Sequence, residues 1–326
     1  REMLLLKGKT RVIVILLIII FILTGCNQQG KEESEDKVLK IGVFLIDDSL
    51  PLFVAEAENL YAKKNIQVEL LPFSSARDKD VALETGVIDG VLTDIVVTAL
   101  LKKGGTDVKI TSFAFGANPQ EGRFAILASP GSTITEPEDL KDVPIAISNN
   151  TMIHYLAEKM PLEVGLKKED IKTQSIPDLN IRLEALISAG VEAAILPDPL
   201  ATLAEKMGAK VIIDDTKLSK NLSQSVIIFR QEVLDKHRDK VALFLEAFEE
   251  AGQLINDNPD KYFELRMEKT RVPQPLRDSY PSPTFSSLAV PDEEMVQSVL
   301  DWMVEKGLLD KPFAYEEIVD KSFIKR

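Results

Sequence analysis

The sequence is poor in the side chains that most often build catalytic and metal sites. Its 326 residues include one cysteine, Cys26, and two histidines, His154 and His237. One thiol forms no disulfide within the chain, and two histidines far apart in the sequence do not match the ligand spacing of a zinc site. The chain also lacks the Gly-x-Ser-x-Gly turn of many serine hydrolases. We therefore expect no metal, no cofactor and no catalytic residues.

Basic side chains are outnumbered as well. Lys and Arg total 39 against 52 Asp and Glu, a net charge of −13. Nucleic-acid phosphates attract basic surfaces, so this balance argues against DNA or RNA as a partner. Apolar content of 45% and charged content of 28% are those of an ordinary globular protein. The length allows one large core or two medium ones, and we favour two.

The apolar run near the N-terminus is too short to span a membrane. Residues 12–23 make roughly 18 Å of helix at about 1.5 Å per residue, against a bilayer core of about 30 Å. Lys7, Lys9 and Arg11 precede this run, which is the arrangement of a signal peptide. We therefore predict a signal peptide over residues 1–25.

The end of this run resembles a bacterial lipobox. It reads Leu23-Thr-Gly-Cys26, which implies cleavage before Cys26 and acylation of its thiol, as by palmitate. An uncleaved anchor with an incidental cysteine remains the alternative. Residues 26–37 are polar and without periodicity, and we interpret them as a flexible tether.

Strand and helix patterns then alternate along the chain. Residues 38–46 are a β-branched apolar run, residues 52–64 have helical spacing, and residues 66–72 are again a strand pattern. Such alternation predicts βαβ units and a parallel sheet. A second series occupies residues 118–218. We therefore predict an α/β protein of two lobes, residues 38–117 with 219–326 and residues 118–218.

Polar side chains follow the predicted strands, where open α/β sheets bind ligands. Those that follow the strands of the first lobe are Asp47, Asp48, Ser49, Ser74, Arg77, Thr93 and Asp94. Those of the second lobe and of the crossing into it are Asn118, Ser148, Asn149, Asn150, Thr151 and Asp198. Turn and cap roles for these residues, or a surface salt bridge for Arg77, remain alternatives. The acids outnumber Arg77 and Arg123, which favours a zwitterion, an amine or a heterocycle over a purely anionic ligand.

Three stretches carry a family resemblance. They are residues 51–69, the segment Leu83-Glu-Thr-Gly-Val-Ile-Asp-Gly-Val-Leu-Thr-Asp94, and a helix pattern from Pro291 to Gly307 that is followed by residues 315–323. Together with the lipobox they resemble the solute-binding lipoproteins of bacterial ABC importers, in the sulfonate/nitrate/taurine and thiamine-pyrimidine precursor family.

The resemblance implies a type II periplasmic-binding-protein fold with mostly parallel sheets, flanking helices and extra C-terminal helices. It also implies a small organic ligand bound between lobes that close like a hinge, an ABC permease with its ATPase as partner, and a lipid-anchored monomer on the extracytoplasmic face of the cell membrane. Thr93 and Asp94 match the family's pocket loop. Asp198 resembles an acidic pocket position, but relatives more often have Glu-Pro there, one methylene longer.

Two other functions remain open. The resemblance includes an enzyme of the pyrimidine-synthase type, whose cysteine-rich motif this chain lacks. The same cleft also suits an extracytoplasmic sensor subunit that reports its ligand to a kinase.

Overall fold

The computed structural model describes residues 37–324. Contacts within the chain separate residues 1–38 from residues 39–326, and the second unit contains two five-stranded sheets. The predicted signal peptide and all of the predicted tether but residue 37 lie outside the described residues. In the described part, no helix has the length and apolarity needed to cross a membrane.

The first sheet has the strand order β2-β1-β3-β10-β4, and we call it and its helices lobe 1. Its strands are β1 (Val38–Val43), β2 (Gln67–Pro72), β3 (Gly90–Thr93), β4 (Val108–Phe115) and β10 (Ser225–Arg230). Its helices are α2 (Leu50–Ala57), α3 (Leu60–Lys63), α4 (Ala76–Glu84), α5 (Ile95–Lys103), α9 (Gln231–Lys236), α10 (Arg238–Asp257), α11 (Phe263–Lys269), α12 (Glu293–Glu305) and α13 (Tyr315–Ile318).

The second sheet has the order β7-β6-β8-β5-β9 and forms lobe 2. Its strands are β5 (Phe124–Ala128), β6 (Pro144–Ile147), β7 (Lys172–Ser175), β8 (Ala193–Pro197) and β9 (Lys210–Asp214), and its helices are α6 (Met152–Glu163), α7 (Leu179–Ile187) and α8 (Leu200–Lys206). Short 3-10 helices are η1 (Asp47–Ser49), η2 (Pro137–Leu140), η3 (Lys168–Asp170), η4 (Asp215–Lys217), η5 (Pro259–Tyr262), η6 (Gln274–Leu276) and η7 (Lys321–Phe323).

Both sheets are mixed, and each contains one strand that runs against its neighbours. In lobe 1 this strand is β10, antiparallel to β3 and β4; in lobe 2 it is β5, antiparallel to β8 and β9. Each reversed strand is the first after the chain crosses between lobes. The chain leaves β4 at its carboxyl end and enters the lobe 2 sheet at the edge where β8 ends. Strand β5 therefore runs antiparallel to β8. The two-lobed α/β prediction is confirmed, while the lobe boundaries at 117 and 218 stay predictions.

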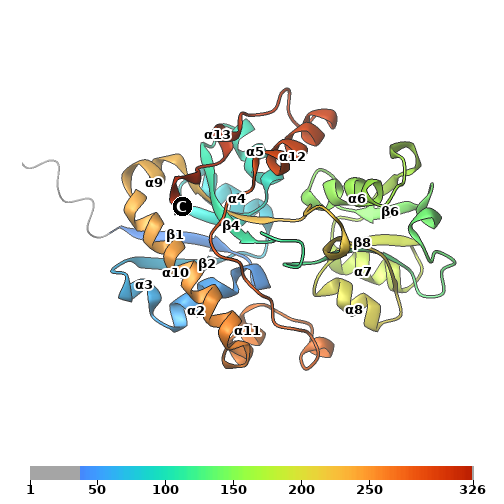
Figure 1. The fold of residues 1–326 in the computed structure, drawn as a ribbon, viewed down its shortest axis with the longest axis horizontal. Helices are drawn as coiled ribbons and strands as arrows, with labels where there is room; N and C mark the ends of the chain where they lie inside the picture. Colours follow the sequence, from blue (N-terminus) through green and yellow to red (C-terminus); the bar gives the residue numbers. More distant parts are fainter. Residues whose placement is uncertain (1–36, 325–326) are drawn as a thin grey trace, which may run out of the picture. The chain divides into compact units, whose positions relative to one another are not determined.

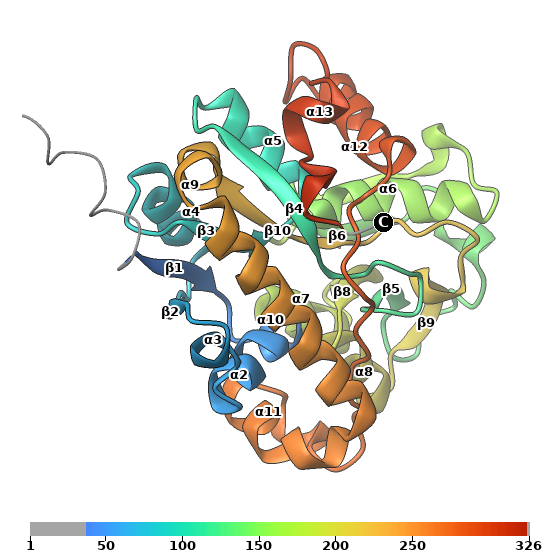
Figure 2. The same ribbon diagram turned by 60° about the vertical axis from the view of Figure 1, so that its left-hand side comes forward.

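The inner strands of each sheet are buried on both faces because helices cover both sides of the sheet. In β10, Val226 and Ile228 pack in one hydrophobic cluster, whereas Ile227 and Phe229 pack in another. This alternation follows the two-residue period of a strand. Figure 2 shows α10 running across one face of the lobe 1 sheet, and α5 with α12 lies on the other.

Two helix limits differ from the sequence prediction. The pattern over residues 52–64 is divided into α2 and α3, because Asn59 adopts a left-handed backbone conformation with φ of 56°. Helix α12 begins after Pro291, since the Asp292 carboxylate accepts a hydrogen bond from the Met295 N–H and caps the helix there.

Candidate functional site

The loop after β1 brings Asp47 against an arginine from the C-terminal part of the chain. The Asp47 carboxylate accepts two hydrogen bonds from Arg266, at 2.9 Å from Nε and 2.8 Å from Nη2. Arg266 is 2% exposed, and its guanidinium lies 4.8 Å from the ring centroid of Tyr280. Bidentate geometry makes such a pair strong. Asp47 is therefore already paired within lobe 1.

Asp48, the next residue, has a different environment. Burial raises the pKa of its carboxyl to about 6, against the effect of a hydrogen bond from Ser225 and with a contribution from the Asp47 charge. Ser49 is fully buried, and its Oγ has no hydrogen-bond partner among the described residues. The two adjacent carboxyl groups therefore differ: Asp47 is paired with Arg266, whereas burial is the main influence on Asp48.

Thr93 is the last residue of β3 and is paired with Val226 of β10, and Asp94 follows it directly. The Asp94 side chain caps α5 by accepting the Val97 N–H at 2.9 Å. Burial raises the pKa of Asp94, although the capping bond and the Lys79 charge oppose this shift. Lys79 is 1% exposed, and its Nζ lies 3.3 Å from both the Leu92 carbonyl and Asp80 Oδ1.

Three other predicted residues lie apart from this group or are committed elsewhere. Ser74 and Arg77 are exposed, and they adjoin the start of α4, which follows the outermost strand of the sheet. Asn118 bonds Glu121 and Ser286 through its Nδ2, and its Oδ1 accepts the Gln120 N–H. Asn118 thus stabilises the first crossing between the lobes through hydrogen bonds.

In lobe 2 the predicted residues follow β6. Ser148 Oγ donates to the Pro177 carbonyl and accepts from Arg182, while Thr151 Oγ1 donates to the Ser148 carbonyl. Asn149 and Asn150 are exposed, and the Asn150 N–H bonds His154 Nδ1. Thr151 begins α6 without a side-chain capping bond.

Arg182 fixes the loop after β6 by hydrogen bonding. It is fully buried and donates to the carbonyls of Ile176, Pro177 and Ile195 as well as to Ser148. Burial lowers the pKa of Arg182 to about 10, with the Asp178 charge acting in the other direction. One guanidinium therefore ties together the ends of β6, β7 and β8.

Asp198, after β8, is paired with Arg123. Its Oδ1 accepts from the Thr202 N–H and Oγ1 and lies 3.6 Å from Arg123 Nη1. Burial raises the pKa of Asp198, and the Arg123 charge opposes this shift. Arg123 also pairs with Glu205 at 2.7 Å and Asp214 at 2.9 Å. Its charge is thus fully compensated within lobe 2.

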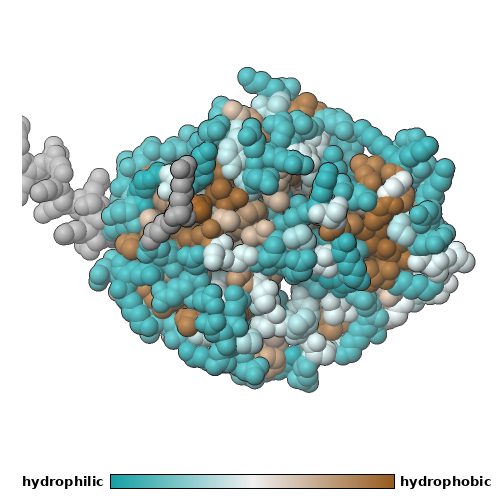
Figure 3. Space-filling view, in the orientation of Figure 1, coloured by the Kyte–Doolittle hydropathy of each residue, from teal (hydrophilic) through white to brown (hydrophobic). Residues whose placement is uncertain are grey.

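Tyr280 feels charges from both groups of residues. Burial raises the pKa of its hydroxyl well above the usual value, and the charges of Asp198 in lobe 2 and Asp47 in lobe 1 raise it further. Tyr280 and Arg266 line a cavity of about 260 Å³ beside Leu50, which starts α2. In Figure 3 the surface is hollowed between the lobes, below the centre of the view. The arrangement suits capture of a small polar molecule.

Comparisons with known proteins identify the family and the fold. The family model described as "NMT1-like family" matches residues 32–265. The chain belongs to the NMT1-like family. Among curated proteins, none matches the sequence.

Solved structures similar to this family member share its fold at low identity. The aliphatic sulphonate-binding protein SsuA of Escherichia coli has a TM-score of 0.74 at 21% identity, covering 89% of this chain and 94% of that chain. The ligand-binding component of an ABC-type import system from Staphylococcus aureus, solved with zinc bound, has a TM-score of 0.71 at 20% identity, covering 88% and 98%. The desulfurization enzyme DSZB has a TM-score of 0.63 at 15% identity, covering 88% and 97%. These likenesses establish the periplasmic-binding-protein fold.

Sequence reasoning missed several polar residues of this NMT1-like chain. Lys79, Arg182 and Arg266 are all buried, although each is a long cationic side chain. A signal was present: Lys79 precedes Ala82 and Leu83 at helical spacing, and Arg182 precedes Leu186 in the same way, so both lie on the apolar faces of their helices. A basic residue on such a face indicates a buried, specifically bonded cation.

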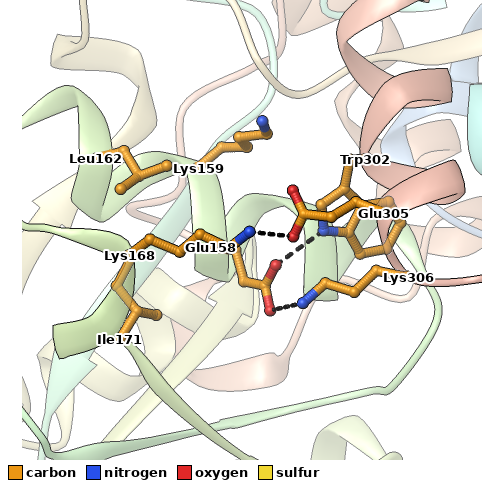
Figure 4. A pocket seen from close by; sticks show the side chains of 8 residues that line it. All are labelled: Glu158, Lys159, Leu162, Lys168, Ile171, Trp302, Glu305 and Lys306. Atoms are coloured by element: carbon orange, nitrogen blue, oxygen red, sulfur yellow. Dashed lines mark hydrogen bonds and ion pairs between the residues drawn. The ribbon is translucent and has the colours of Figure 1, made fainter.

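A second hollow lies between α6 and α12, with a volume of about 160 Å³. Figure 4 shows Glu158 accepting bonds from Trp302 Nε1 at 2.9 Å and Lys306 Nζ at 2.5 Å. Lys168 pairs with Glu305 across the same hollow. Because these charges neutralise one another, we interpret this hollow as a contact between lobe 2 and α12.

A metal centre has no support in the described part of the chain. In residues 37–324, no group of three or more His, Cys, Asp or Glu side chains is placed to hold a metal ion. His154 is engaged with Glu158 and the Asn150 N–H.

Proposed function

We propose that the chain is the lipid-anchored, extracytoplasmic solute-binding protein of an ABC importer. It binds a small organic solute between its lobes, in the class of a sulfonate, a taurine-like zwitterion or a pyrimidine precursor of thiamine. Closure of the lobes around the solute presents a surface to a membrane permease with its ATPase. The protein acts as a monomer, held at the membrane through acylated Cys26.

The observation that carries this proposal is the placement of polar side chains at the ends of strands from both lobes. Asp48 and Asp94 follow strands of lobe 1, and Asp198 follows a strand of lobe 2, with Tyr280 under the influence of charges from both. Ligands of open α/β sheets bind at this position. Membership of the NMT1-like family and the likeness to two import-system binding proteins support the same function.

Native mass spectrometry of the purified chain in mild detergent, before and after partial unfolding, tests the proposal. A co-purified small molecule, released on unfolding, is the expected result. A thermal-shift panel of sulfonates, pyrimidines, amines and oxyanions then identifies its class, because a ligand bound only by the folded state raises the melting temperature. An empty protein that no panel compound stabilises would count against solute binding.

Two alternatives have separate tests. Catalysis is suggested by the likeness to DSZB, an enzyme on a similar fold. A change in the mass of the bound compound during incubation would establish turnover, whereas a binding protein returns it unaltered. A sensor subunit uses the same cleft; genes for a permease and an ATPase beside this one favour the importer, and a neighbouring kinase gene favours the sensor.

A further inference from the structure

The lobes meet on one side through a dry contact between α6 and α12. Trp302 of α12 and Tyr155 of α6 are 2% and 1% exposed, and their rings lie edge to face with centroids 5.6 Å apart. The Tyr155 hydroxyl lies 2.9 Å from Ser298 Oγ. The Glu158 carboxylate of α6 accepts hydrogen bonds from Trp302 and Lys306. Separating the two helices would expose both rings to water and leave Glu158 without two of its donors.

A second contact with lobe 2 is made by residues 271–283, which we call the strap. The strap follows α11 and contains four prolines, which fix φ and stiffen its backbone. Leu276 is buried, and its carbonyl accepts the Tyr280 N–H at 2.8 Å. Arg266 of α11 stacks on the Tyr280 ring and pairs with Asp47, in the loop after β1. The strap is therefore held to lobe 1 beside a strand end of its sheet.

On the lobe 2 side the strap meets Lys206, the last residue of α8. Lys206 is exposed, and its Nζ donates a hydrogen bond to the Pro275 carbonyl. The preceding residue, Glu205, pairs with Arg123 at 2.7 Å. Arg123 directly precedes β5, whose first residue is paired with Pro197 at the end of β8. Lys206 therefore lies near the edge of lobe 2 at which β8 ends, and it bonds the strap from there.

The two contacts differ in what it takes to break them. The bond between Lys206 and the strap is exposed, so water competes for both groups, whereas the α6–α12 contact is apolar and buried. Figures 1 and 2 show α6 and α12 on one side of the chain crossings, and α8 and α11 on the other. The cavity of about 260 Å³ lies on this second side, between the strap and α11. A rotation that keeps the dry contact and breaks the exposed bond therefore opens the molecule at the strap.

We propose that the cleft opens and closes on the side of the strap, by rotation of the lobes about the α6–α12 contact, with Lys206 as the residue that fastens the closed form. A solute enters between the strap and α8. The strap moves with lobe 1, because Leu276 and Tyr280 hold it there, and the Lys206 bond forms when the lobes have closed. This direction of motion rests on the proposed solute-binding function, to which it adds a residue that controls closure.

Two spectroscopic measurements on the Cys26→Ser chain, which has no other thiol, test the inference without a ligand. Spin labels at Gln274→Cys on the strap and Glu184→Cys on α7, both exposed positions, report the opening through the distance between them. Trp302 is the single tryptophan of the sequence, so quenching of its fluorescence by acrylamide reports the α6–α12 contact. Lys206→Met is expected to lower the ratio of closed to open form by about two- to tenfold, the range for one hydrogen bond, while Trp302 quenching stays unchanged.

Two variants serve as controls. Lys206→Arg keeps a donor at the same position, and Lys311→Met removes an exposed lysine elsewhere; both are expected to leave the distances as they are. Unchanged distances in Lys206→Met would overturn the role of Lys206. Stronger quenching of Trp302 in the opened variant would mean that α6 and α12 separate, which would overturn the rotation.

Binding kinetics connect this motion to the solute. For any panel compound that binds the unaltered chain, Lys206→Met is expected to raise the dissociation rate about two- to tenfold, because the closed form is less populated. An equal dissociation rate would contradict the role of Lys206 while leaving solute binding intact. A panel without any ligand would instead count against the proposed function, and the distances would still decide how the lobes move.

Discussion

Glu158 is the carboxylate that accepts the most side-chain hydrogen bonds at the contact between α6 and α12. Burial by itself would raise the pKa of Glu158, but bonds from His154, Lys306 and Trp302 outweigh it and lower the pKa to about 2. Because the folded-state pKa lies below the ordinary 4.5, the stabilisation is complete above pH 4.5 and is lost as the pH falls through 2. We predict that Glu158→Gln lowers the free energy of unfolding by about 2 kcal/mol at pH 7.

Urea titration at pH 7 and at pH 3 measures this difference. The gap between the Glu158→Gln variant and the unaltered protein is expected to narrow at pH 3. Glu184→Gln, at an exposed position of α7, is the control and is expected to change stability by less than about 0.5 kcal/mol. A pH-independent gap would show that the charge of Glu158 is not the cause.

Gln224 presents the opposite situation, a buried amide without partners. It lies in the second crossing, 6% exposed, and neither Oε1 nor Nε2 has a hydrogen-bond partner among the described residues. An unpaired buried polar group costs about 1–3 kcal/mol. We predict that Gln224→Leu raises the free energy of unfolding by about that amount in chemical denaturation. Gln253→Leu, on the exposed side of α10, is the control, and a loss of stability in Gln224→Leu would contradict the prediction.

At the scale of elements, Arg182 links separate loops and a strand through side-chain hydrogen bonds. It joins the loops after β6 and β7 to β8. A lysine could not replace it, because its three donors lie on one nitrogen, whereas those of the guanidinium are spread over a planar fork. We predict that Arg182→Lys destabilises the protein by about 2–4 kcal/mol and increases amide hydrogen exchange in residues 148–151 and 176–178.

The control is Arg77→Lys, because Arg77 is exposed and its replacement removes no buried bond. Its effect on stability is expected to stay within about 0.5 kcal/mol. Equal exchange in the two variants would mean that Arg182 does not hold these loops.

Elements were easier to predict from the sequence than the contacts between them. Strands β1 and β2 lie within the predicted strand patterns at residues 38–46 and 66–72, since a short apolar run between turn residues specifies a strand. By contrast, the partner of Asp47 is Arg266, 219 residues later in the chain. No local periodicity encodes such a pair. The strand-end rule therefore located candidate residues, but it did not distinguish Asp47, already paired, from Asp48, which is not.

At the scale of the whole molecule, α12 links the lobes in addition to the two chain crossings. Figure 1 shows α12 near α5 and α6. The helix packs on α5 of lobe 1 and bonds α6 of lobe 2 through Tyr155–Ser298 and the Glu158 group. In the closure that we propose, the lobes therefore either turn about this contact or break it. The first is favoured, because Trp302 and Tyr155 are almost completely buried in one shared hydrophobic cluster.

The proposed membrane attachment depends on a single side chain, that of Cys26. Each buried CH₂ of an acyl chain contributes about 0.8 kcal/mol, so two or three chains hold firmly where one does not. We predict that Cys26→Ser shifts the protein from the membrane fraction to the medium or the periplasm, measured by fractionation and immunoblotting. Gln29→Ser, in the same tether, is expected to stay with the membrane. Retention of Cys26→Ser through an uncut apolar segment would contradict the lipobox interpretation, because the run at residues 12–23 would then be the anchor itself.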